Sequence, residues 1–173
     1  VNGPVDFHAM AVSPVNPNLV YGWYQGNLQR STDQGKTWEI INRDLLPVYL
    51  AGDTQDENIV YAATPQGQGV MISRDKGASW SSLSTALEGG AVSIIAIHPL
   101  DSKILLTFSE KLGGLGKSID GGTTWQKVSE GFNGETILHI ASSRSAPNTV
   151  YALTHENKLY KSSDAGDTWT QTR

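Results

Sequence analysis

One eight-residue pattern occurs four times along this chain and constrains its fold more than any other feature. The pattern reads Ser-x-Asp-x-Gly-x-Thr/Ser-Trp, and its copies occupy residues 31–38, 73–80, 118–125 and 162–169. The aspartates of successive copies are 42, 45 and 44 residues apart. A pattern that returns at such a period is typical of repeat architectures, in which each repeat is one supersecondary unit.

A second feature precedes each copy. Residues 18–21, 58–61 and 148–151 share the pattern Asn-x-Val-Tyr, and residues 103–106 are a degenerate version in the third unit. In the first unit, short apolar runs predict strands at 7–12, 19–24, 27–31 and 37–41. Four short strands in a repeat of this length are typical of propeller blades. Because no stretch has the i, i+3, i+4, i+7 spacing of an amphipathic helix, repeats that alternate strand and helix are not expected.

The sequence therefore predicts an all-β protein, a β-propeller with four blades of four antiparallel strands each. The blades are expected near residues 5–43, 47–86, 90–130 and 135–173, within a single domain that spans residues 1–173. Each unit supplies its own four strands, so no terminal strand remains to lock the ring. We therefore expect a partial propeller, completed either by further blades or by a second copy in a homodimer, ahead of the alternative of a closed four-bladed monomer.

The repeated pattern has a clear structural role. Its aspartate accepts hydrogen bonds from its own turn, its glycine takes the positive φ that the turn needs, and its tryptophan offers a large ring to the gap between blades. One carboxylate per turn supplies too few oxygens for calcium. We expect each tryptophan ring to be mostly buried. The residues with these structural roles are Asp33, Gly35, Trp38, Asp75, Gly77, Trp80, Asp120, Gly122, Trp125, Asp164, Gly166 and Trp169.

The pattern resembles the Asp box, or BNR repeat, of sialidase-like β-propellers, and the resemblance covers all four units. Residues 8–21 are similar to exported bacterial BNR-repeat proteins that are described as glycosyl hydrolases. Asp boxes also occur in xyloglucanases, in sortilin-type receptor propellers and in a photosystem assembly factor. The resemblance implies boxes at the blade periphery, away from any active site. It also implies an exported bacterial protein, extracellular or periplasmic, whose signal sequence is not among these residues.

The composition excludes several kinds of site. With no cysteine, the chain has no disulfide, no cysteine-ligated zinc and no cysteine nucleophile. The net charge of −4 argues against binding to nucleic acid or to an anionic membrane. No run of apolar residues is long enough to cross a membrane. Neither a phosphate-binding glycine loop nor a nucleophile elbow nor a His-Glu-x-x-His motif is present, and no cofactor is expected.

A catalytic role would need carboxylates in a particular arrangement. Sialidases use an arginine triad, introduced by a Phe/Tyr-Arg-Ile-Pro segment that this chain lacks. Other glycoside hydrolases need two carboxyl groups about 5–10 Å apart across a cleft. The candidates for such a pair are Asp6, Asp44, Glu88, Glu110 and Glu135.

Ligand binding is expected on the face opposite the boxes, where the links between blades meet the turns between second and third strands. The candidate residues there are Trp23, Tyr24, Arg43, Tyr49, His139 and His155. Aromatic rings such as Trp23 and Tyr24 can pack on apolar sugar faces. His8 and His139 are expected at similar places in the innermost strands, with Tyr49 and Ser93 at the corresponding places between them. This histidine pair is a weak candidate for a metal site.

Two functions from different classes follow. Because the fold motif is strong and no catalytic set is complete, we expect a non-catalytic recognition or scaffold propeller that binds a protein segment or a glycan. The alternative is a glycoside hydrolase, sialidase-like or active on β-glucan, whose carboxylates lie on the same face or on blades outside this chain.

Overall fold

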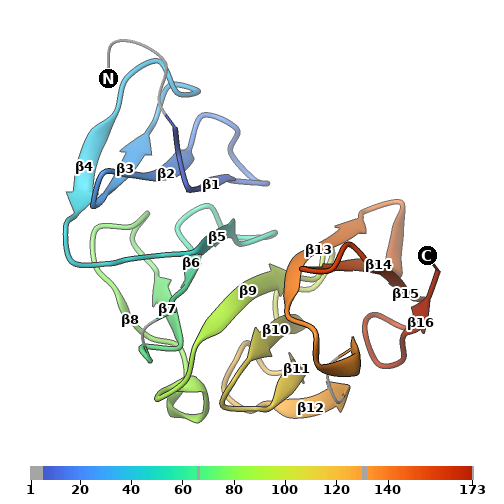
Figure 1. Ribbon diagram of the computed structural model, residues 1–173. Coiled ribbons are helices and arrows are strands. Elements are labelled where there is room, and N and C mark those ends of the chain that lie inside the picture. Colours follow the sequence, from blue (N-terminus) through green and yellow to red (C-terminus); the bar gives the residue numbers. More distant parts are fainter. Residues whose placement is uncertain (1–5, 66, 130–131, 173) are drawn as a thin grey trace.

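Short strands and tight turns alternate along the whole chain. The computed structural model describes residues 6–65, 67–129 and 132–172, and its strands form four antiparallel sheets of four strands each (Figure 1). Beyond the strands, the described residues contain two short 3-10 helices, η1 (Thr85–Leu87) and η2 (Phe132–Gly134). This arrangement confirms the predicted all-β propeller class. The expected blade limits at Val5, Glu130 and Arg173 lie outside the described residues.

Each sheet takes its strands from one stretch of chain, in sequence order. The first sheet contains β1 (Ala9–Val12), β2 (Val20–Tyr24), β3 (Asn27–Ser31) and β4 (Glu39–Asn42). The second contains β5 (Tyr49–Gly52), β6 (Val60–Ala63), β7 (Val70–Ser73) and β8 (Ser81–Ser82). The third contains β9 (Val92–Ile97), β10 (Leu105–Ser109), β11 (Gly114–Ser118) and β12 (Gln126–Ser129). The fourth contains β13 (Ile137–Ser143), β14 (Ala146–Thr154), β15 (Leu159–Ser162) and β16 (Thr170–Gln171).

The innermost strands β1, β5, β9 and β13 follow one another around a common axis, and the arc is open between β1 and β13 (Figure 1). Among the described residues, three apolar clusters fill the spaces between successive blades. Strand alternation sets which cluster a residue joins, since successive side chains point to opposite faces. In β5, Leu50 packs in the cluster shared with the first blade, while Tyr49 and Ala51 pack against the cluster shared with the third.

The Asp box folds as a network of hydrogen bonds within one turn. In the first box, the Ser31 hydroxyl donates to Asp33 Oδ1 at 2.8 Å and accepts from the Gly35 N–H at 2.8 Å. The Thr37 N–H donates to Asp33 Oδ1 at 2.8 Å, and the Thr37 hydroxyl donates to Asp33 Oδ2 at 2.7 Å. The Thr37 N–H is therefore used by the turn, which explains why β4 begins at Glu39 and not at residue 37 as predicted.

All four box glycines have a positive φ, as predicted: 84° at Gly35, 88° at Gly77, 90° at Gly122 and 93° at Gly166. The carbonyl of each glycine accepts a hydrogen bond from the indole N–H of the box tryptophan at 2.9–3.0 Å. All four tryptophans are in large part buried, as expected, and each keeps some surface exposed. The box lies at the periphery of its blade, so part of the ring remains open to solvent.

The second sequence feature serves the box through its backbone. The first residue of this feature is asparagine in three units and Lys103 in the third. In every unit its backbone carbonyl accepts a hydrogen bond from an N–H of the box turn. These bonds join Gln34 to Asn18 at 3.2 Å, Lys76 to Asn58 at 2.9 Å, Gly121 to Lys103 at 3.0 Å and Ala165 to Asn148 at 2.8 Å. Because a carbonyl does not depend on the side chain, Lys103 replaces asparagine without loss of the bond. The boxes therefore share one end of the blades with the turns between first and second strands.

Candidate functional site

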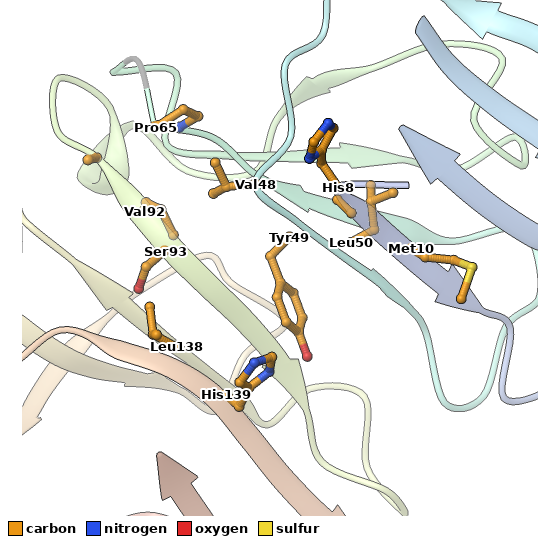
Figure 2. A pocket seen from close by; sticks show the side chains of 12 residues that line it. His8, Met10, Val48, Tyr49, Leu50, Pro65, Val92, Ser93, Leu138 and His139 are labelled. Carbon is orange, nitrogen blue, oxygen red and sulfur yellow. The ribbon is translucent and has the colours of Figure 1, made fainter. Parts of the chain in front are cut away.

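A cavity of about 570 Å³ lies on the axis, at the end of the blades away from the boxes. Residues at the beginnings of all four innermost strands line it, together with Pro65 from the link between β6 and β7 (Figure 2). The lining residues are His8, Ala9, Met10, Val48, Tyr49, Leu50, Pro65, Ala91, Val92, Ser93, Leu138 and His139. The cavity therefore lies on the face where sequence reasoning expected ligand binding.

His8 and His139 line the same cavity, but strand pairing shows that they are not equivalent residues. Four alanines mark the common register, because Ala11, Ala51 and Ala141 pair with the tyrosine of the second sequence feature and Ala96 pairs with Leu106. Counted from these alanines, His8 corresponds to Val48, Ser93 and Leu138, and His139 corresponds to Ala9, Tyr49 and Ile94. The repeated alanine was the signal that could have aligned the units correctly.

The cavity has few polar groups. Ser93 donates its hydroxyl hydrogen to the Ile137 carbonyl at 2.7 Å, so that hydroxyl offers lone pairs to a ligand. Burial raises the pKa of the Tyr49 phenol, which therefore stays protonated and can donate. His8 and His139 are both exposed. None of the described residues that line the cavity is an aspartate or a glutamate.

Trp23 supports the cavity without lining it. The centroids of the Trp23 and His8 rings are 5.7 Å apart, and Trp23 also packs against the apolar cluster between the first two blades. The His8 N–H donates to the Trp23 carbonyl at 3.1 Å. Trp23 thus lies behind His8, and its role in stacking on a sugar stays a prediction.

Other candidate residues lie away from the cavity. Tyr24 is half-buried beside Phe7, at 6.2 Å between ring centroids. Arg43 is exposed and donates to Asn27 Oδ1 at 2.7 Å, and His155 is exposed and accepts from the Thr136 N–H at 3.2 Å. The carboxylates of Asp6, Asp44 and Glu88 belong to exposed residues outside the cavity lining.

The two remaining candidate carboxylates have different surroundings. Glu110 lines a second cavity of about 450 Å³, which shares Ala91 and Ser93 with the axial cavity, and accepts from the Ala91 N–H at 3.1 Å. Glu135 is buried, forms an ion pair with Lys158 and accepts a hydrogen bond from the Thr154 hydroxyl. The pKa of Glu135 is lowered mainly by the Lys158 ammonium and to a lesser extent by the Thr154 hydroxyl. Glu135 is therefore a charged carboxylate with a structural role.

A metal site between His8 and His139 would need further ligands. In the described parts of the chain, no group of three or more histidine, aspartate or glutamate side chains is arranged to hold a metal ion.

The apolar part of the cavity lining was not predicted from the sequence. It includes Met10, Val48, Leu50 and Leu138. Apolar residues at the start of a strand look alike whether they line a cavity or pack against a neighbouring blade.

Family models match two parts of the chain. The model described as BNR/Asp-box repeat matches residues 29–39, and the model described as Sortilin, neurotensin receptor 3, matches residues 113–173. Among curated proteins, the chain is 28% identical to the xyloglucanase Xgh74A of Acetivibrio thermocellus and 28% identical to a xyloglucanase of Hypocrea jecorina. The alignments cover 69% and 70% of this chain but 19% of each relative, so the chain spans about a fifth of their length.

Solved structures share the fold. A GH74 enzyme from Niastella koreensis superposes with a TM-score of 0.78 at 20% identity, over 95% of this chain and 30% of that one. YCF48 from Cyanidioschyzon merolae superposes with a TM-score of 0.66 at 17% identity, over 99% of this chain and 57% of that one. Together with the four sheets and the four box networks, these matches identify the chain as a β-propeller built of Asp-box (BNR) repeats.

Proposed function

We propose that this protein is a non-catalytic recognition propeller that binds a protein segment or a glycan in its axial cavity. One observation carries the proposal: all four blades contribute to a single cavity that contains hydrogen-bonding groups but no carboxylate among its described lining residues. Its volume of about 570 Å³ lies within the range of ligand pockets, roughly 300–1,000 Å³.

The lining suits a ligand that has apolar surface and a few hydrogen-bonding groups. Apolar contact with a ligand comes from Met10, Val48, Leu50 and Leu138. Such contact favours binding but does not fix the orientation of the ligand. The Tyr49 hydroxyl and the two imidazoles supply directional hydrogen bonds, which fix the orientation of the ligand. Such a mixture serves recognition, whereas cleavage of a glycosidic bond needs two carboxyl groups.

A glycoside hydrolase is the second candidate function, and the similarity to xyloglucanases favours it. Its acid and base would come from the carboxylates near the same face, of which Glu110 borders a neighbouring cavity, or from blades outside this chain. Glu135 is a poor candidate, because its ion pair with Lys158 keeps the carboxylate charged and occupied.

We also propose that the protein is exported from a bacterium and works outside the cytoplasm. The relatives are named for a polysaccharide, and a polymer of that kind is met outside the cell. In the described residues, no helix has the length and apolar character needed to cross a membrane. Fractionation of the full gene product in its native host tests the location, and retention in the cytoplasm would contradict it.

His139 and His155 offer a matched pair for testing the cavity, because both are exposed histidines and only His139 lines it. Xyloglucan oligosaccharides and a library of synthetic peptides are screened as probes, and the best binder is measured by calorimetry. We expect His139→Ala to weaken binding about tenfold, the effect of losing one good hydrogen bond. His155→Ala should leave the affinity unchanged. Equal affinities for the two variants would place the ligand elsewhere.

A further inference from the structure

A second cavity, of about 450 Å³, lies between the third and fourth blades and borders the axial cavity. Ala91 and Ser93 line both cavities. The other walls of the second cavity come from the turn between β10 and β11, and from Gly134 and Thr136 in the link that leads to β13. Its lining therefore belongs to two adjacent blades and their link. Because the shared residues are small, an extended ligand can reach from one cavity into the other.

A backbone irregularity gives Ser93 its place between the two cavities. The pairing of β9 with β10 shifts by one residue opposite Ser93, which makes Ser93 the extra residue of a β-bulge. In the fourth blade, Leu138 is the extra residue at the equivalent position. Figure 2 shows both side chains at the edge of the axial cavity. A bulge bends its strand and re-aims a side chain. The β1–β2 and β5–β6 pairings run without a shift, so the bulges accompany the two blades that enclose the second cavity.

The hydroxyl of Ser109 lines the second cavity, is fully buried and has no hydrogen-bond partner among the described residues. The hydroxyls at the equivalent strand ends do have partners. Thr64 donates to a backbone carbonyl at 2.8 Å, and Thr154 donates to the Glu135 carboxylate. The third unit has Gly90 where the fourth has Glu135, so that position supplies no carboxylate to Ser109. A buried polar group without a partner costs free energy, which a ligand with a matching group would recover.

Glu110 is held at the junction of the two cavities. Its N–H donates to the Ala91 carbonyl at 2.9 Å, and its Oε2 accepts from the Ala91 N–H at 3.1 Å. His155 forms the same two bonds with Thr136 in the fourth blade, so this strand end fixes the side chain that follows it. Ala91 occupies one carboxylate oxygen of Glu110 and leaves Oε1 to a ligand. Among the described residues that line either cavity, no aspartate, lysine or arginine accompanies this carboxylate.

The second cavity thus offers oxygen atoms that accept hydrogen bonds. The Ser93 hydroxyl gives its hydrogen to a backbone carbonyl at 2.7 Å and presents lone pairs, and the Ser109 hydroxyl can accept as well as donate. Arginine and lysine side chains carry several N–H donors, a positive charge and no acceptor, which suits oxygens grouped beside the Glu110 carboxylate. Lys127 Nζ lies at the outer rim, 3.6 Å from an added Cβ at Gly113. A basic group is therefore expected at the inner end, near Ser93 and Ser109.

We infer that the second cavity binds a basic side chain of an extended protein segment whose neighbouring residues occupy the axial cavity. A neutral sugar has no charge to match Glu110, so charge complementarity favours a protein segment over a glycan. The net charge of −4 attracts a basic ligand in the same sense. The inference rests on the proposed recognition function and narrows its ligand.

Two synthetic peptide libraries test the inference on the intact chain. One library has arginine fixed at a central position, and its twin has citrulline there, which keeps the shape of arginine without the charge. We expect peptides selected from the arginine library to bind, and their citrulline twins to bind about tenfold more weakly, the smaller effect of losing a hydrogen bond to a charged group. Added salt should weaken the arginine peptides more than the citrulline twins.

Three variants locate the basic group. Glu110→Gln should remove the preference for arginine, whereas Glu88→Gln changes an exposed residue outside both cavity linings and should leave that preference unchanged. Ser109→Ala should weaken the arginine peptides about fivefold without lowering the melting temperature, because the hydroxyl that it removes has no partner in the described fold. Circular dichroism confirms that each variant is folded.

Equal affinities for arginine and citrulline peptides overturn the inference. So does a preference for arginine that Glu110→Gln leaves intact, and so does a chain that binds no peptide of either library. The proposed function is tested separately, because His139→Ala acts on the axial cavity. A ligand that binds without regard to charge, and that His139→Ala weakens, would refute the basic subsite and leave the recognition function standing.

Discussion

Replacing Trp125 with alanine is expected to lower the free energy of unfolding by about 3 kcal/mol, the lower end of the range for truncating a tryptophan. Trp125 packs against the apolar cluster between the second and third blades, and its indole N–H donates to the Gly122 carbonyl at 3.0 Å. The ring is half-buried, so the loss should stay below that of a completely enclosed tryptophan. Against a total stability of about 5–15 kcal/mol, the change is large.

Denaturant titration followed by circular dichroism measures this loss. Ile119→Ala is the control within the same box, because Ile119 is largely exposed and its truncation should change the unfolding free energy by less than about 0.5 kcal/mol. Equal stability of the two variants would contradict the structural role of the box tryptophan.

Acidification should destabilise the protein as the pH falls from about 4 toward 2. In the boxes, hydroxyl and backbone N–H donors from the same turn lower the pKa of Asp33, Asp75 and Asp120 to about 2, and they lower that of Asp164 also. An unfolded aspartate has a pKa of about 3.9, so the unfolded chain binds protons first as the pH drops. The stability that these carboxylates contribute is therefore complete above pH 4 and is lost through that window.

The unfolding free energy measured at intervals between pH 6 and pH 2 tests this expectation. Asp120→Asn should be less stable than the native chain at pH 6, and its stability should depend less steeply on pH below 4, because one low-pKa group is gone. A native chain whose stability stays constant from pH 5 to pH 2 would show that the box carboxylates do not contribute as described.

The blades were predictable from the sequence because their determinants are local. The turn of a box forms from its own Ser, Asp, Gly, Thr or Ser, and Trp within eight residues. Each copy therefore predicts a turn and the strands on either side of it. The degenerate segment at Lys103 caused no error, since its contribution to the box is a backbone carbonyl.

The axial cavity was less predictable because five distant segments form it. Tyr49, His8 and His139 were expected near the ligand face and do line the cavity. Their apolar neighbours were missed, since no local pattern separates a lining residue from a packing residue. The role of Glu135 depends on Lys158, a partner 23 residues away that is fixed only when β14 and β15 pair.

The extent to which each box tryptophan is covered also depends on distant residues. The box alone fixes the hydrogen bond from each indole N–H to a glycine carbonyl. The side chains of the neighbouring blade determine how much of each indole ring is covered. For Trp38 the nearest aromatic cover is Phe7 of its own blade. Local hydrogen bonds thus make the box turns predictable, whereas the exposed fraction of each tryptophan depends on how the blades pack.

Recognition without catalysis is tested most directly by exposing the purified chain to synthetic peptides, xyloglucan, other β-glucans and sialosides while binding and product release are measured together. We expect binding of one probe class that His139→Ala weakens, and no release of reducing ends or free sialic acid above a blank without protein. Steady product release that Glu110→Gln abolishes, in a variant that remains folded, would contradict the recognition function and establish a hydrolase in its place.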